Sequence, residues 1–255
     1  MISVGVDVGS ISAKAVVMQE NAILASAVLL TGYNARKAGR QAFDQVLAAA
    51  KITAEQVDRI VATGYGRNSV DFADRAVTEI TCHAAGAHHL DPTVRAIIDI
   101  GGQDSKAIVL DANGKVKDFA MNDKCAAGTG RFLEVMARAL ELDLDAFGDL
   151  SLAADRAAPI SSMCTVFAES EVISLIAKGE RRANIIAGIH ASIAARVVAM
   201  ARRIGLRPPV MMTGGVARNI GVVRALEEKM GGALIVSDRA QVTGAIGAAL
   251  IAATL

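Results

Sequence analysis

One pattern of apolar and polar positions occurs twice along the chain. The stretch VDVGSISAKAVVMQEN at residues 6–21 aligns at a constant offset with IDIGGQDSKAIVLDAN at residues 98–113. The alignment pairs Asp7 with Asp99 and matches apolar runs in the two stretches to each other. A solenoid repeats every ~20–50 residues. A single repeat at a longer distance indicates a duplicated domain instead.

Each copy of the pattern predicts a β-meander. The apolar run that contains the aspartate is typical of a buried strand, and a second apolar run follows a short Gly/Ser turn. Turn residues at Glu20-Asn21 and at Asn113-Gly114 then precede a third strand. The Asn-Gly pair is the stronger turn signal, because both of its residues tolerate positive φ.

A segment with apolar residues at helical spacing follows each meander. Residues 35–50 carry apolar positions at helical intervals, and residues 59–64 (RIVATG) predict a further strand. Later in the chain, PPVMMTGGVARN at residues 208–219 indicates a strand, a glycine turn and a helix start. A long apolar stripe precedes it, formed by Ile185, Ile189, Ile193 and Val197.

These elements predict an α/β protein of two duplicated units that share a cleft. We assign residues 1–95 plus 240–255 to the first half and residues 96–239 to the second half. The second half is longer because of an insert at about 120–180. Ligands of α/β sheets bind where strand ends converge, so we expect the site between the halves.

Composition narrows the function classes. The 255 residues are 53% hydrophobic, only 3% aromatic and contain no Trp, which argues against base stacking on single-stranded nucleic acid. The net charge of +1 gives no strong electrostatic attraction to nucleic acid or to an anionic membrane. The apolar C-terminal stretch is shorter than the ~20 residues of a membrane span, and the N-terminus reads as a strand. We therefore expect a cytoplasmic protein with no nucleic-acid or membrane partner.

The two Asp-x-Gly turns predict a phosphate site. We expect Asp7 and Asp99 to face each other across the cleft and to hold Mg²⁺, largely through water. Glycine allows backbone N–H groups to approach a phosphate. No P-loop or GxGxxG motif occurs. The expected donors and point charges are Ser10, Ser12, Gly101, Gly102, Lys14 and Lys106.

DVGSISAK, DIGGQDSK and MTGGVARN resemble the phosphate and adenosine motifs of the actin, sugar kinase and heat-shock chaperone ATPase superfamily. The resemblance implies two ribonuclease-H-like domains hinged around ATP. It also implies that Gln103 or Asp104 positions the attacking water, and sequence does not choose between them. The implied phosphate-motif residues are Gly9, Ser10, Ser12, Ala13 and Lys14, with Gly101 and Gly102. The implied adenosine contacts are Gly214, Gly215, Val216, Asn219 and Gln241.

The three cysteines, Cys82, Cys125 and Cys164, show no CxxC spacing. We expect Cys125 at or just before a helix that starts near Gly130, and Cys164 ahead of another helix. Helix N-termini stabilise anions such as a thiolate cluster. A [4Fe–4S] cluster needs four thiolates, so two chains related by a two-fold axis are required. The alternative is that both are small buried residues, the commonest fate of a free Cys.

NDKCAAGTGRFLEVMA and ISSMCTVFAESEVISLIAKG resemble the activator component of 2-hydroxyacyl-CoA dehydratases, as do ATGYGRNS, ITCHAAGA and GIHASIAARV. The resemblance covers the whole chain. It implies a homodimer with one [4Fe–4S] cluster held by Cys125 and Cys164 of each subunit. It also implies ATP-driven transfer of one electron to a dehydratase, with a ferredoxin or flavodoxin-like protein as the upstream donor.

Three other functions stay open at this point. One is the ATPase subunit of a benzoyl-CoA reductase, which uses similar parts. The others are a small-molecule kinase of the same superfamily and a binding or regulatory ATPase without redox chemistry. We expect Cys82 to be a core or surface thiol. The histidines His83, His88 and His89 lack the i, i+4 spacing of a helical metal site, and His190 is expected to be structural.

Overall fold

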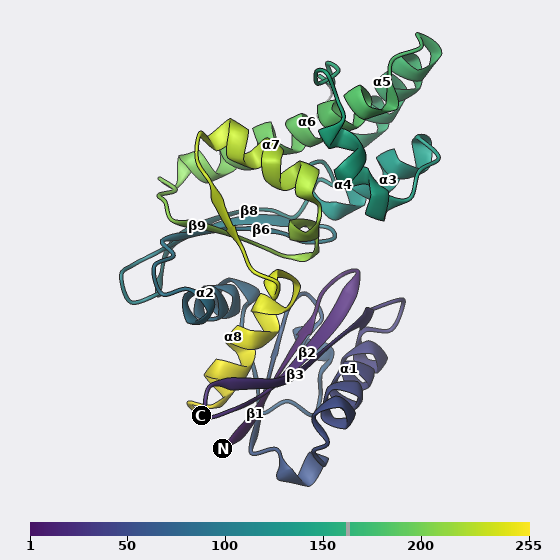
Figure 1. The fold of residues 1–255 in the computed structure, drawn as a ribbon. Coiled ribbons are helices and arrows are strands. Elements are labelled where there is room, and N and C mark those ends of the chain that lie inside the picture. The colour runs from purple at the N-terminus through teal and green to yellow at the C-terminus, as the bar shows by residue number, and fades with distance from the viewer. Residues whose placement is uncertain (162–163) are drawn as a thin grey trace.

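The computed structural model describes residues 1–161 and 164–255 (Figure 1). Within these residues the strands form two five-stranded sheets with the same order, in which the first strand of each sheet is central. The first sheet contains β1 (Ile2–Val8), β2 (Ser12–Gln19), β3 (Ala22–Leu30), β4 (Arg59–Thr63) and β5 (Arg75–Ala76). The second contains β6 (Ala96–Ile100), β7 (Ser105–Leu110), β8 (Val116–Asn122), β9 (Val210–Thr213) and β10 (Leu234–Val236). The predicted duplication of an α/β unit is confirmed.

Both predicted meanders are present, but their turns differ. Glu20 and Asn21 both have positive φ, 49° and 66°, and form a two-residue turn between β2 and β3. At the second turn only Gly114 has positive φ. There the carboxylate of Asp111 accepts the N–H groups of Asn113 and Lys115, which widens the turn. The tighter turn therefore occurs where the sequence signal is weaker.

Helices cover both faces of the first sheet. Helix α1 (Ala35–Ala50) packs on the face that carries Val6 and Val17, whereas α8 (Thr243–Ala252) packs on the face that carries Val16 and Met18. This division follows the alternation of side chains along a strand. Asn34 caps α1 by accepting the N–H of Lys37 at 3.0 Å.

Helices α2 (Glu79–Leu90) and α8 cross between the two sheets (Figure 1). Helix α2, which the predicted division assigns to the first half, also packs Ala84 and Ala87 against the second sheet. Glycines make the crossing close. A methyl group on Gly86 would collide with the carbonyl oxygen of Thr243, and one on Gly247 would collide with that of Cys82. The two backbones therefore touch at this junction.

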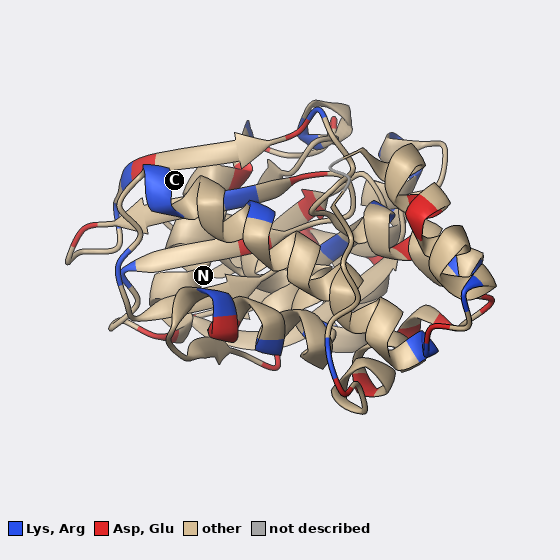
Figure 2. Ribbon diagram, turned by 90° about the horizontal axis from the view of Figure 1, so that it is seen from above, with Lys and Arg blue, Asp and Glu red and all other residues tan. Residues whose placement is uncertain are grey.

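The second half carries the remaining helices: α3 (Gly130–Ala139), α4 (Leu144–Leu152), α5 (Thr165–Ala177), α6 (Arg182–Arg203) and α7 (Ile220–Met230). Their apolar side chains form the largest core cluster together with β6 and β9. Among the described helices, α6 is the one whose length and composition would suit a membrane span, and 56% of its apolar window is buried. Such burial is typical of a core helix. Figure 2 shows both signs of charge interspersed over the molecule seen from above.

Candidate active site

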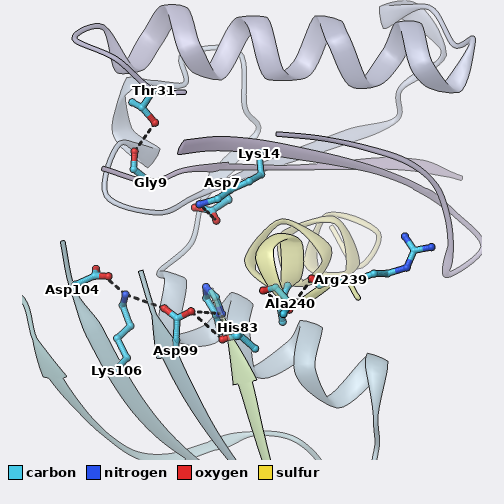
Figure 3. Close-up of polar contacts among 12 residues, drawn as sticks. Asp7, Gly9, Lys14, Thr31, His83, Asp99, Asp104, Lys106, Arg239 and Ala240 are labelled. Atoms are coloured by element: carbon cyan, nitrogen blue, oxygen red, sulfur yellow. Dashed lines mark hydrogen bonds and ion pairs between the residues drawn. The ribbon is translucent and has the colours of Figure 1, made fainter. Parts of the chain in front are cut away.

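Equivalent strands of the two halves each carry a carboxylate–ammonium pair. Asp7 on β1 lies opposite Lys14 on β2, and Asp99 on β6 lies opposite Lys106 on β7. The Nζ atom of Lys14 is 3.2 Å from Oδ2 of Asp7, and that of Lys106 is 3.3 Å from Oδ2 of Asp99. Figure 3 shows the two pairs on strands of separate sheets. The repeated sequence pattern therefore places the same aspartate–lysine pair at matching positions of the two sheets.

The parallel strand beside each aspartate ends in a Thr-Gly pair, at residues 63–64 and 213–214. The hydroxyl of Thr213 donates to Oδ1 of Asp99 at 2.9 Å. Both glycines have positive φ, 84° and 87°. A methyl group on the second would lie 2.8 Å from Oδ1 of Asp99, and one on the first would collide with Oδ1 of Asp7. The sequence prediction found only the second of these matching pairs.

The charges of the second pair support one another. Burial by itself raises the pKa of Asp99, but His83, Lys106 and the Thr213 hydroxyl outweigh burial and lower this pKa to about 2. Burial also disfavours the ammonium form of Lys106, whose Nζ lies 2.7 Å from Oδ2 of Asp104. The carboxylates of Asp99 and Asp104 nevertheless raise the pKa of Lys106 above its ordinary value. Asp99 and Lys106 therefore both stay ionised at neutral pH.

A cavity of about 690 Å³ lies between the halves, next to these pairs. Every predicted nucleotide-binding residue lines it except Ala13, which packs into the core beneath α1. The two residues considered for positioning water differ in placement. Asp104 lines the cavity, whereas Gln103 is exposed and does not belong to the lining.

The two loops predicted to bind phosphate, residues 9–12 and 101–104, close in the same way. The N–H of Gly9 donates to the carbonyl of Ser12 at 3.0 Å, and the N–H of Gly101 donates to that of Asp104 at 2.9 Å. The hydroxyl of Thr31 holds the first loop by donating to the carbonyl of Gly9 at 2.8 Å (Figure 3). Each loop thus presents a short glycine turn beside its aspartate.

The second phosphate loop also contacts its counterpart and a helix. A methyl group on Gly102 would lie 2.5 Å from Cγ1 of Ile11, so the two loops touch across the cavity. On its other side, the carbonyl of Gly101 accepts the N–H of Gly130 at 2.9 Å. The carbonyl of Gly102 accepts the N–H of Arg131 at 2.8 Å. The first turn of α3 is therefore bonded directly to the loop.

The turn expected to contact adenosine forms one edge of the cavity. The N–H of Gly214 donates to the carbonyl of Ala240 at 2.9 Å, which joins this turn to the segment that contains Gln241. The side chain of Asn219 caps α7 by accepting the N–H of Val222 at 3.1 Å. Asn219 thus also has a structural role that the sequence prediction did not include.

His83 is a cavity residue that the sequence prediction set aside. Its Nδ1 lies 3.1 Å from Oγ1 of Thr213 and 3.5 Å from Oδ1 of Asp99 (Figure 3). Spacing within one helix carried no sign of this role, because both contacts are to residues outside the helix and Thr213 is 130 positions away. The available signal was the position of His83 in the ITCHAAGA motif.

Cys125 is half-buried in the turn between β8 and α3. Helix α3 begins at Gly130, as predicted, but a turn separates the helix from the cysteine. The side-chain amide of Asn122 holds this turn by donating to the carbonyls of Cys125 and Ala127, at 2.9 and 3.2 Å. The sequence prediction did not identify Asn122.

Cys164 is exposed and occupies the N-cap position of α5, which packs against α3. Within residues 1–161 and 164–255, no three His, Cys, Asp or Glu side chains are grouped to hold a metal ion. Two cysteines near neighbouring helix starts, one of them exposed, fit a thiolate cluster that a second copy completes. Cys82 does not fit, because burial raises the pKa of its thiol to about 12.

The chain is similar in sequence and in fold to several known proteins. An activator of lactoyl-CoA dehydratase from Anaerotignum propionicum is 50% identical over 99% of this chain and 97% of its own. The crystal structure of (R)-2-hydroxyglutaryl-CoA dehydratase component A from Acidaminococcus fermentans is 45% identical, covers 100% and 98% of the two chains and superposes with a TM-score of 0.97. The 2-hydroxyisocaproyl-CoA dehydratase activator from Clostridium difficile, with bound ADPNP, is 44% identical over 99% and 94%, with a TM-score of 0.94. The pattern of the BadF/BadG/BcrA/BcrD ATPase family matches residues 4–252, and the chain belongs to this family of ATPases.

Proposed function

We propose that this ATPase is a homodimeric activator that transfers single electrons to a 2-hydroxyacyl-CoA dehydratase in the cytoplasm. The observation that carries the proposal is the 50% identity, over nearly the full length of both chains, to an activator of lactoyl-CoA dehydratase. The electron comes from a reduced ferredoxin or flavodoxin-like donor. One electron leaves the donor and one reaches the partner, so the activator returns to its starting redox state.

The nucleotide phosphates bind between the two carboxylate–ammonium pairs. Asp7 and Asp99 hold Mg²⁺ through water, and the ion neutralises charge on the phosphates when it is bound. Lys14 supplies a positive charge from the first half, and Lys106 does so from the second. Asp104 is the better candidate for orienting the attacking water, because it lines the cavity and Gln103 does not.

The cluster belongs to the dimer. Cys125 and Cys164 of each subunit supply two thiolates, which gives the four that a [4Fe–4S] cluster needs. When bound, the cluster supplies a one-electron redox centre. Isologous association places the same two cysteines of each chain against the two-fold axis. The exposure of Cys164 supports this arrangement, since its side chain is open to a second copy.

Hydrogen bonds connect the loop at Gly101 and Gly102 to the segment that carries Cys125. The carbonyls of Gly101 and Gly102 accept the first N–H groups of α3, and Cys125 lies in the turn that leads into this helix. The turn is itself held by Asn122 at the end of β8. A shift of the phosphate loop on hydrolysis therefore pulls directly on the segment that carries Cys125.

Cysteine variants test the shared cluster. We expect Cys125→Ser and Cys164→Ser to abolish the charge-transfer absorbance near about 400 nm, because each removes two of the four thiolates in the dimer. Cys82→Ser is the matched control and should keep the colour, since Cys82 is buried away from the surface. Anaerobic purification and iron analysis measure the result, with about four irons expected per dimer.

Other results of these experiments would indicate a different cluster site or a different function. About four irons per monomer, or a cluster that survives both cysteine variants, would contradict the shared site. A colourless protein that phosphorylates a small molecule would indicate a kinase instead. Electron transfer to a benzoyl-CoA reductase-type partner, with no activation of any 2-hydroxyacyl-CoA dehydratase, would leave the cluster in place and overturn the partner class.

A further inference from the structure

The side chain of His83 lines the cavity and contacts Asp99, the aspartate of the second half. The side chain projects from α2 and is only 8% exposed. Its Nδ1 lies 3.1 Å from Oγ1 of Thr213 and 3.5 Å from Oδ1 of Asp99. Since the Thr213 hydroxyl is also 2.9 Å from that same oxygen, the three groups form a closed triangle. The imidazole therefore contacts Oδ1 of Asp99, whereas Lys106 pairs with Oδ2.

The other side of the same ring approaches the first aspartate. Gly244, in the first turn of α8, leaves a space between them. A methyl group on Gly244 would lie 2.9 Å from Nε2 of His83 and 3.1 Å from Oδ2 of Asp7. The His83 ring thus contacts Asp99 through Nδ1 and faces Asp7 across the space at Gly244, from a helix that packs against both α8 and the second sheet.

We propose that His83 is a positioning residue for ATP hydrolysis, which fixes Asp99 through Thr213 and sets its separation from Asp7. This inference rests on the proposed Mg²⁺-nucleotide site. The two carboxylates come from different halves, so no strand pairing fixes the distance between them. A divalent ion held near both requires that distance to be constant, and His83 contributes to this by contacting Asp99 and facing Asp7 from a helix packed against both α8 and the second sheet.

Three substitutions of His83 test this role. Asparagine places a polar atom near the position of Nδ1, glutamine places one near Nε2, and leucine removes both. We expect His83→Leu to lower kcat about tenfold to a hundredfold while KM for ATP changes less than about threefold, because the polar contacts of the ring are with Asp99 and Thr213. His83→Asn should recover most of kcat, and His83→Gln less, since the bond to Thr213 is made by Nδ1.

A second readout does not depend on turnover. Calorimetry with ADP, in EDTA and then with Mg²⁺, measures the gain in affinity that the metal provides. We expect this gain to shrink in His83→Leu and in Gly244→Ala, whose added methyl displaces the ring and Asp7. The matched controls are His89→Leu and His89→Asn on the exposed side of the same helix, together with Gly232→Ala, where a methyl group meets nothing.

Two results would overturn the role of His83. One is a normal kcat and a normal Mg²⁺-dependent gain in His83→Leu. The other is equal loss in His83→Leu and His83→Asn together with a lower Tm in both, which would indicate packing alone. Asp7→Asn, measured in parallel, separates this inference from the site itself. Loss of activity in Asp7→Asn with normal His83→Leu removes only the inference, whereas normal activity in Asp7→Asn removes the proposed site.

Discussion

Each half of the protein carries the same pair of opposite charges, an aspartate and a lysine on neighbouring strands. A buried aspartate at a strand end is paired with a lysine on the next strand, at 3.2 Å in the first half and 3.3 Å in the second. The surroundings are unequal, because Lys106 also pairs with Asp104 and Asp99 also accepts a threonine hydroxyl. The second aspartate is therefore the more tightly fixed of the two.

Removing either carboxylate tests the nucleotide site. We expect Asp7→Asn and Asp99→Asn each to lower the rate of ATP hydrolysis at least about a hundredfold, since a bound metal lowers the barrier by several kcal/mol. The visible spectrum of the proposed cluster should stay unchanged, because its ligands are cysteine thiolates and neither aspartate supplies one. Phosphate release measures the rate. Turnover near the wild-type value in both variants would show that the carboxylates serve another purpose.

Sequence reasoning at the residue scale identified the cavity positions that the duplication repeats, and the roles assigned to them stay predictions. The aspartates and lysines were predictable because the duplication repeats them at matched positions. His83 and Asn122 were not, since their partners depend on the fold. The hydrogen-bond partner of His83 is Thr213, 130 positions away. Asn122 acts on a turn whose path only the structure shows.

At the scale of elements, the α2–α8 crossing depends on the absence of side chains. We expect Gly247→Ala to destabilise the protein by about 1–3 kcal/mol, because its methyl group would force the helix backbones apart at the carbonyl of Cys82. The midpoint of urea denaturation measures the change. Gly232→Ala is the control, since a methyl group there meets nothing and should shift stability by less than about 0.5 kcal/mol.

A buried histidine joins α6 to its neighbours. The ring of His190 packs edge-on against Phe147 of α4, with centroids 5.6 Å apart, and a methyl group on Gly221 of α7 would lie 2.5 Å from its Nδ1. Among the described residues neither ring nitrogen has a hydrogen-bond partner. Burial lowers the pKa of His190 to about 4, so the folded protein holds this side chain neutral.

The lowered pKa of His190 predicts a pH dependence of stability. Between the ordinary value of about 6.5 and the folded value of about 4, the unfolded chain binds a proton that the folded chain does not. Stability should therefore fall as pH drops through this window, by about 1.4 kcal/mol per unit. The difference in unfolding free energy between wild type and His190→Leu at pH 7, 6 and 5 measures it. A difference independent of pH would contradict the prediction.

Element prediction was accurate where periodicity is long. Residues 35–50 form one helix as predicted, because apolar positions recur along four turns and Asn34 supplies a cap. The short helix α4 was not predicted within the insert, since nine residues give little periodicity. Strand β10 has only three residues and is defined by its pairing with β9 rather than by its own sequence.

For the whole molecule, the central expectation is coupling between nucleotide and cluster. We expect an iron chelator to strip the cluster at clearly different rates in ADP and in a non-hydrolysable ATP analogue, because the loop at Gly101 and Gly102 is bonded to α3. A tenfold difference corresponds to about 1.4 kcal/mol of coupling if stripping follows the open population. Equal rates with both nucleotides, with binding confirmed separately, would show that the two sites are independent.

The α2–α8 crossing has a mechanical consequence. The chain passes between the halves twice, once through α2 and once before α8, and the two passages lie side by side. Two adjacent covalent connections permit rotation about the line through them and resist sliding. Asp7 lies beside this crossing, because a methyl group on Gly244 of α8 would lie 3.1 Å from its Oδ2. Helices α3 and α5, in contrast, extend toward the end of the molecule farthest from the termini (Figure 1). A rotation about that line would therefore move the start of α5, where Cys164 is the N-cap, through a longer path than it moves Asp7.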